Sequence, residues 1–139
     1  MFTSKCFIRI NKPYIIDNLI ELGYVKALFD EEYTESEAYG LIVDQGDIAP
    51  LVYGIQEMEL MFTYGFIDCD ENVNLFLALA ALRDDSDINQ YFICDKVSVA
   101  LGKTYYPGDY IYYQYDEFFD KQNWHKATVE EIIEHFKKE

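Results

Sequence analysis

The chain has 139 residues and a formal net charge of -15 at pH 7, from 26 acidic and 11 basic side chains. Half of the residues are apolar and 17% are aromatic, so residues 1–139 are predicted to form a single globular domain with a packed core. The acidic balance disfavours direct binding to nucleic acid phosphates or to anionic lipid headgroups, which requires clustered lysine and arginine.

Cysteine spacing and hydropathy predict a cytoplasmic protein. Cys6, Cys69 and Cys94 are odd in number, widely spaced and without a CxxC pair, which is typical of reduced, mostly buried thiols. The longest unbroken apolar run, residues 75–82, has eight residues, whereas a bilayer span needs about 20. The start, MFTSKCFIRI, lacks the pattern of a signal peptide. We therefore expect no membrane contact.

The first half of the chain predicts one helix and several short strands. A strand is expected at residues 6–10, followed by a helix over residues 12–22 that Asn11 caps and Gly23 ends. Its apolar stripe comprises Ile15, Ile16, Leu19, Ile20 and Leu22. Further strands are predicted at residues 39–43, 51–55 and 62–67, with a loop at residues 44–47.

The middle of the chain predicts a buried helix over residues 71–83, capped by Asp70 and apolar on most of its surface. The acidic residues at its start and the arginine at its end suit the helix dipole. A turn at residues 84–87, with the sequence DDSD, then leads into a strand at residues 90–94.

The last third predicts a hairpin and a final helix. The sequence of residues 106–109, YPGD, is typical of a type II turn, and it is expected to join a strand before it to a strand at residues 110–115. Thr128 and Glu131 have the spacing of a capping box for a helix over residues 129–138. These elements predict an α+β fold, with a mixed or mainly antiparallel sheet packed against about three helices.

Two segments, FLALAALRDDSDINQYF in the middle and KATVEEIIEHFKK near the end, resemble small uncharacterised proteins carried by phages and mobile elements of gut bacteria. The resemblance covers most of the chain. Its motifs are helix caps and core positions, so it implies a cytosolic accessory protein and no catalytic residue.

The sequence gives no positive indication of a metal site, a cofactor or catalysis. Residues 68–72 and 85–89 begin like calcium loops, but both lack the glycine at the sixth position and the glutamate at the twelfth. They are predicted to be caps and turns. The alternative is a small enzyme with an unrecognised site that combines the thiols with carboxylates of the DDSD turn, namely Asp84, Asp85 and Asp87. The two imidazoles, His125 and His135, lie in no metalloprotease spacing.

Charge segregation is the first of two features that suggest binding to another protein. Residues 27–82 hold twelve acidic residues and no lysine, arginine or histidine. Such a surface attracts proteins with basic surfaces and can mimic a nucleic acid, blocking a protein that binds one. Improved solubility is the alternative interpretation. The candidate contact residues are Glu31, Glu32, Glu35, Glu37, Asp44 and Asp47.

Tyrosine is the second such feature, because six of the thirteen tyrosines lie between residues 105 and 115. On the predicted last strand of the hairpin, Tyr110 and Tyr112 point to one face and Tyr113 and Tyr115 to the other. Tyrosine is enriched in recognition surfaces, although half-buried sheets also use it freely. The predicted function is therefore a non-enzymatic acidic interaction module whose partner is a protein with a basic surface; the oligomeric state is not defined by the sequence.

Overall fold

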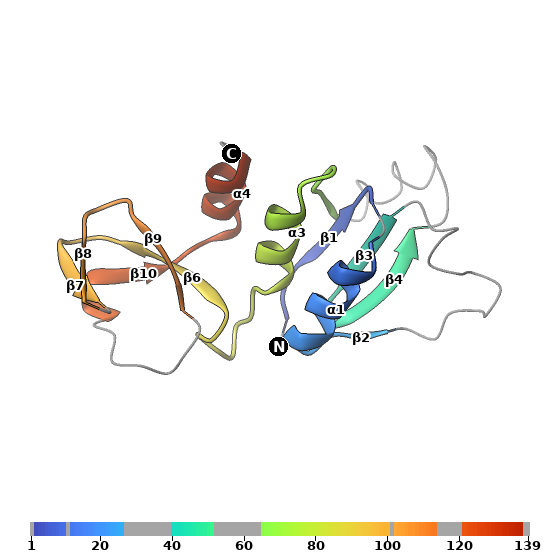
Figure 1. Cartoon of the computed structure of the whole chain (residues 1–139), viewed down its shortest axis with the longest axis horizontal. Coiled ribbons are helices and arrows are strands. Elements are labelled where there is room, and N and C mark those ends of the chain that lie inside the picture. The colour runs from blue at the N-terminus through green and yellow to red at the C-terminus, as the bar shows by residue number, and fades with distance from the viewer. Residues whose placement is uncertain are drawn as a thin grey trace. The chain divides into compact units, whose positions relative to one another are not determined.

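Figure 1 shows a computed structural model of the chain, which describes residues 2–10, 12–26, 40–51, 65–100, 102–113 and 121–137. These residues group into two compact units, residues 1–84 and residues 85–139. The α+β class is confirmed, because the described residues form three α-helices and sheets of mostly antiparallel strands. The strands of the described residues are divided among three sheets, not one. That the whole chain folds as a single domain stays a prediction.

The first unit is built on a mixed sheet with the strand order β2-β4-β3-β1-β5 among the described residues (Figure 1). The strands are β1 (Lys5–Ile8), β2 (Val25–Lys26), β3 (Gly40–Asp44), β4 (Asp47–Leu51) and β5 (Ile67–Asp68). β1 pairs antiparallel with β3 and parallel with β5, and β4 pairs antiparallel with β3 and parallel with β2. Phe7 and Ile8 of β1 are fully buried, so the core of this unit lies against β1.

The β3–β4 connection is tighter than the sequence predicts. Gln45 and Gly46 both have positive φ angles, 48° and 106°, as a type I′ turn requires. The predicted four-residue loop is therefore a two-residue turn, and β4 begins at Asp47 instead of residue 51. The predicted strand at residues 62–67 is also wrong in its bounds, because β5 comprises Ile67–Asp68. Residues 52–64 lie outside the described part of the chain.

Helix α1 (Pro13–Leu22) begins and ends close to the predicted positions. The residue that flanks its start is Lys12, which has extended backbone and makes no capping hydrogen bond with its side chain. The predicted capping residue, Asn11, lies outside the described residues. Gly23 ends the helix as predicted, with a φ of 114° that only glycine adopts at little cost. Ile20, expected on the buried stripe, is exposed.

Helix α3 (Val73–Ala80) is shorter than the predicted helix over residues 71–83. Its cap is Asn72, whose Oδ1 accepts the amide hydrogen of Leu75 at 3.0 Å. Asp70 cannot be the cap because its φ of 51° places it in a left-handed turn before the helix. No acidic residue lies in the first turn, so the expected dipole pairing is wrong. The predicted burial is confirmed: α3 lies against β1 and α1, and its buried residues are Leu75, Phe76, Ala78, Leu79 and Ala80.

The second unit contains two antiparallel sheets among its described residues. One has the order β10-β6-β9 and the other pairs β7 with β8; the strands are β6 (Gln90–Cys94), β7 (Ser98–Ala100), β8 (Lys103–Tyr105), β9 (Tyr110–Tyr113) and β10 (Trp124–Lys126). A short 3-10 helix, η1 (Lys121–Asn123), precedes β10, and helix α4 (Val129–Lys137) follows it. None of the described helices of the chain has the length and apolarity needed to cross a membrane.

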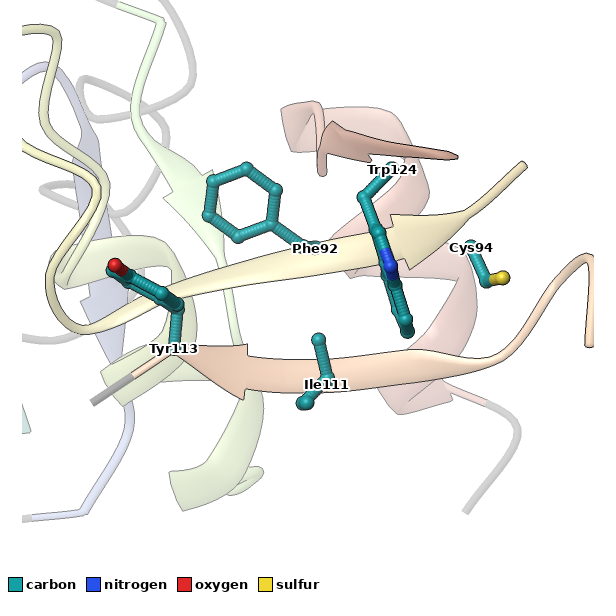
Figure 2. Close-up of a cluster of buried hydrophobic side chains, with 5 residues drawn as sticks. All are labelled: Phe92, Cys94, Ile111, Tyr113 and Trp124. Carbon is teal, nitrogen blue, oxygen red and sulfur yellow. The ribbon is translucent and has the colours of Figure 1, made fainter. Parts of the chain in front are cut away.

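The strand register of the three-stranded sheet defines its two faces. One face carries a buried cluster that Figure 2 shows, formed by Phe92, Cys94, Ile111, Tyr113 and Trp124. The opposite face carries Tyr91, Ile93, Tyr110, Tyr112 and His125. Helix α4 lies on this second face, since the ring of its Phe136 packs edge-on against Tyr91 at a centroid distance of 5.4 Å.

The predicted tyrosine hairpin is wrong in its pairing, although its turn is confirmed. Gly108 has a φ of 95°, and the amide of Asp109 donates to the carbonyl of Tyr106 at 3.0 Å, as in a type II turn. However, β8 before the turn pairs with β7, and β9 after the turn pairs with β6. The turn therefore connects two different sheets.

The capping box at the start of α4 is confirmed. The amide of Glu131 donates to Thr128 Oγ1 at 3.3 Å, and the amide of Thr128 donates to Glu131 Oε1 at 3.1 Å. Two amides that the helix itself cannot pair are thereby satisfied.

Replacing Thr128 by alanine is expected to lower the free energy of unfolding by about 1 kcal/mol, because the Glu131 amide loses its acceptor. Urea titration followed by circular dichroism measures this change. Thr104→Ala is the matched control, since Thr104 is exposed and takes part in no helix cap; it should change stability by less than about 0.5 kcal/mol. Equal effects of the two substitutions would contradict the assignment of the cap.

Candidate functional site

An exposed apolar face on the β7–β8 hairpin is the strongest candidate for an interaction surface. Val99 pairs with Thr104 across the two strands. Val97 and Tyr106 flank the strands two residues from Val99 and Thr104, so strand alternation assigns them to the same face. The side chains of Val97, Val99 and Tyr106 are 58%, 71% and 60% exposed. We call these three residues the hairpin face.

The opposite side of the same hairpin is packed. Ser98 is buried, and the ring of Tyr105 contacts Trp124 edge-on at a centroid distance of 5.2 Å. The buried cluster of Figure 2 thus supports the hairpin from one side and leaves the hairpin face in solvent. Exposed large apolar side chains that are grouped on a supported surface are typical of binding sites.

The local charge on the hairpin is balanced. Lys96 and Lys103 are exposed, and Asp95 and Asp109 lie at the two ends of residues 95–109, which contain no other charged side chain. Lys103 Nζ lies 5.1 Å from the ring centroid of Tyr105. The hairpin is therefore less acidic than the chain as a whole.

The tyrosines of β9 divide between the two faces as predicted. Tyr113 is buried in the cluster of Figure 2, which removes it as a contact residue for a partner. Tyr112 is 39% exposed, packs against the ring of Tyr91 at 5.0 Å and donates its hydroxyl hydrogen to Asn89 Oδ1 at 3.0 Å. Tyr110 is partly buried under α4, and Tyr115 lies outside the described residues.

The acidic candidates are only partly described. Glu31, Glu32, Glu35 and Glu37 lie outside the described residues. Asp44 and Asp47 form the closing pair of the β3–β4 turn, where Asp47 is exposed and Asp44 is partly buried.

Asp68, another residue of the acidic segment 27–82, is paired with Arg9. Asp68 accepts two hydrogen bonds from the guanidinium of Arg9, at 3.2 Å and 2.5 Å. The acidic segment is therefore partly neutralised by a residue from outside it, which the sequence alone does not reveal.

A second cluster joins Asp95, His125 and Glu131, and no motif predicts it. His125 Nδ1 lies 2.7 Å from Asp95 Oδ1, and Nε2 lies 2.9 Å from Glu131 Oε2 and 3.1 Å from Oε1. The three side chains are between one third and one half exposed. We call them the His125 cluster.

The electrostatics of the His125 cluster favour the charged forms. The hydrogen bond to Glu131 raises the pKa of His125 above its ordinary 6.5; partial burial opposes this rise and Asp95 adds to it. Partial burial disfavours ionised Glu131, but hydrogen bonds from His125 and Thr128 outweigh it and lower the pKa of that carboxyl. Both ring nitrogens are occupied by carboxylates, so His125 is not placed to act as a general base.

The environments of Cys6 and Cys94 suppress the reactivity of their thiols. All three are buried and free, as predicted. Burial raises the pKa of Cys6 well above its ordinary value, with a further contribution from Cys69, and burial likewise raises the pKa of Cys94. Since the thiolate is the nucleophile, these environments do not favour covalent catalysis by Cys6 or Cys94.

The DDSD turn is held by structural contacts. Asp84 ends the first unit and Asp85 begins the second, and both are exposed. Lys126 Nζ donates to the carbonyl of Ser86 at 2.8 Å and lies 3.9 Å from Asp87 Oδ1. Among the residues that the structure describes, no group of three or more His, Cys, Asp or Glu side chains is arranged to hold a metal ion.

No protein-family model, curated protein sequence or solved structure matches this chain. The resemblance of its two segments to small phage proteins stays a prediction.

Proposed function

We propose that this chain is a non-enzymatic protein-interaction module and that its contact surface is the hairpin face. The main support for the proposal is that the β7–β8 hairpin is packed on one side and exposed on the other. Tyr105 on one side is packed against Trp124, whereas Val99 on the other side is 71% exposed. A partner that covers this side would bury Val97, Val99 and Tyr106 together, without first rearranging the hairpin.

The net charge supports a partner with a basic surface. At -15 the chain produces a negative field that accelerates the approach of basic proteins. The charge near the hairpin face is balanced, so we assign the two effects to different steps. The acidic residues of the chain attract the partner over a distance, and the hairpin face keeps it bound.

Proteins that bind nucleic acids are the class of partner whose surfaces are most consistently basic. Binding of the acidic module to such a protein would block its nucleic acid site, and this inhibition is the activity that we propose. The free thiols of Cys6, Cys69 and Cys94 support an action in the cytoplasm.

Site-specific photo-crosslinking tests the proposal. A benzophenone side chain is placed at Val99, and in a control protein at Val25, a strand valine of the first unit that is 64% exposed. We expect the probe at position 99 to capture a basic protein in the native cell, and capture should fall when unlabelled protein competes. Association measured with the purified partner should slow as ionic strength rises, since salt screens the attraction.

Two outcomes would contradict the proposal. Capture of the same proteins from positions 99 and 25 would mean that the hairpin face has no special role. A crosslink from position 99 to a second copy of the chain would assign this face to self-association, and the basic partner would be wrong.

A further inference from the structure

His125 connects three structural elements of the second unit. It lies on β10, whereas Asp95 lies in the connection after β6 and Glu131 lies in the first turn of α4. Asp95 is 30 residues and Glu131 is six residues away from His125 in the chain. We propose that the His125 cluster is a pH-sensitive clasp, in which protonated His125 fastens Asp95 and the first turn of α4 to β10 and loss of the proton releases one of them.

The geometry requires a proton on each ring nitrogen. Nδ1 faces a carboxylate oxygen of Asp95 at 2.7 Å, and Nε2 faces Glu131 at 2.9 Å. Ionised carboxylates only accept hydrogen bonds, and neutral imidazole carries only one N–H group. After deprotonation one nitrogen therefore presents a lone pair to a carboxylate, and that contact becomes repulsive.

Other polar groups lie near His125 on the same face of the sheet, on its own strand and on α4. On the same face of the sheet, Tyr110 of β9 donates its hydroxyl hydrogen to the backbone carbonyl of Glu131 at 3.2 Å. Partial burial raises the pKa of Tyr110, and Glu131 and Glu134 raise it further, so this phenol stays neutral. On β10 itself, Lys126 is directed toward Ser86 and Asp87. The other charged groups on α4 are Glu130, Glu134, His135 and Lys137.

The direction of the pH dependence follows from the two shifted groups. The pKa of His125 is raised, so its contribution to stability is complete below pH 6.5 and disappears as the pH rises through the folded-state pKa. The pKa of Glu131 is lowered, so its contribution is present above pH 4.5 and disappears as the pH falls through the folded-state pKa. The clasp is therefore strongest between about pH 4.5 and pH 6.5 and opens on the alkaline side.

Opening of the clasp would affect the residues that lead into the β7–β8 hairpin. The amide of Asp95 donates to the carbonyl of Asn123 at 2.7 Å, beside β10, and Val97 follows two residues later. On the helix side, the amide of Ile132 donates to the carbonyl of Thr128 at 3.0 Å. Exchange at the Asp95 amide therefore reports on the contact between His125 and Asp95, and exchange at the Ile132 amide reports on the contact between His125 and Glu131. The inference depends on this geometry and not on the proposed function.

Nuclear magnetic resonance of the full chain tests the clasp. The chain has two histidines, so its imidazole carbon signals can be assigned with His135→Gln. We expect His125 to titrate above pH 6.5. Hydrogen exchange at the Asp95 and Ile132 amides, corrected for its intrinsic pH dependence, should quicken at one or both amides between pH 6 and pH 9, by about tenfold for each pH unit by which the measured pKa exceeds 6.5.

Substitutions distinguish an effect of His125 protonation from a general effect of side-chain packing. His125→Gln should remove the pH dependence of exchange, whereas His135→Gln should preserve it, because His135 is held by ring contacts with Tyr110 and Phe136. Glu131→Gln retains an acceptor for the capping box and should lower the pKa of His125, and Asp95→Asn should lower it as well. The clasp is overturned if His125 titrates at or below pH 6.5, or if exchange in His125→Gln keeps the pH dependence of the wild type.

Discussion

Replacing Gly40 by alanine is expected to cost about 3 kcal/mol or more of the free energy of unfolding, because the added carbon has no space. A Cβ at this position would lie 2.0 Å from the carbonyl oxygen of Ile8 and 3.1 Å from Cα of Arg9. Both atoms belong to the backbone at the end of β1, so a change of side-chain rotamer cannot remove the clash. Relief requires β1 and β3 to separate where Ile8 pairs with Leu41.

Gly65→Ala provides the control for this substitution. Gly65 has a φ of 82°, and among the described residues, its chain neighbours aside, no atom lies within 4 Å of the position that its Cβ would occupy. Alanine there should cost only the conformational penalty of about 1 to 2 kcal/mol. Urea titration followed by far-ultraviolet circular dichroism measures both variants. If Gly40→Ala proved no more destabilising than Gly65→Ala, the close approach of β3 to the end of β1 would be wrong.

Replacing Trp124 by alanine is expected to cost about 3 to 5 kcal/mol, as for other large buried aromatic side chains. Trp124 is buried between β6 and the β7–β8 hairpin, where it contacts Cys94 and Tyr105. Its removal leaves a cavity in the cluster of Figure 2 and takes away the support of the hairpin. Since this is the only tryptophan of the chain, unfolding of the variant has to be followed by circular dichroism.

Tyr106→Ala is the matched control for the loss of an aromatic ring from this region. Tyr106 is on the exposed side of the same hairpin, and its replacement should change stability by less than about 0.5 kcal/mol. A small effect of Trp124→Ala, comparable to that of Tyr106→Ala, would mean that the hairpin is not supported by the buried cluster.

Local signals in the sequence predict the helix ends to different degrees. Thr128 and Glu131 are three residues apart and pair with each other, so spacing alone identifies their capping box. Asp70 and Asn72 are both good caps by residue type, and only the backbone angle of Asp70 decides in favour of Asn72. Propensity cannot resolve such a choice between near neighbours.

Strand pairing and exposure depend on contacts that are distant in the sequence. The turn at residues 106–109 is evident from its residues, but nothing in it indicates that β8 pairs with β7 and β9 with β6. The alternation of Val97, Ser98 and Val99 indicates a strand with two unlike faces. Which face is packed is decided by Trp124, whose contact with Tyr105 places Ser98 inside and the valines outside.

The His125 cluster illustrates the same limitation for a polar site. The sequence spacing identifies Glu131 as a capping residue. Its hydrogen bond to His125 corresponds to no recognisable sequence motif. Asp95 reaches His125 only because β6 and β10 are paired, with Trp124 opposite Cys94. The acidic residues that the sequence emphasises most, those at residues 30–37, lie outside the described part of the chain.

The affinity of the captured partner for two double variants tests the hairpin face most directly. Val99→Ser with Tyr106→Ser changes that face, and Val25→Ser with Tyr14→Ser changes a valine and a tyrosine of similar exposure, 64% and 52%, in the first unit. We expect the first pair to weaken binding at least about tenfold, equivalent to about 1.4 kcal/mol, and the second pair to leave it unchanged. Equal affinities of the two double variants would contradict the assignment of the hairpin face as the contact surface.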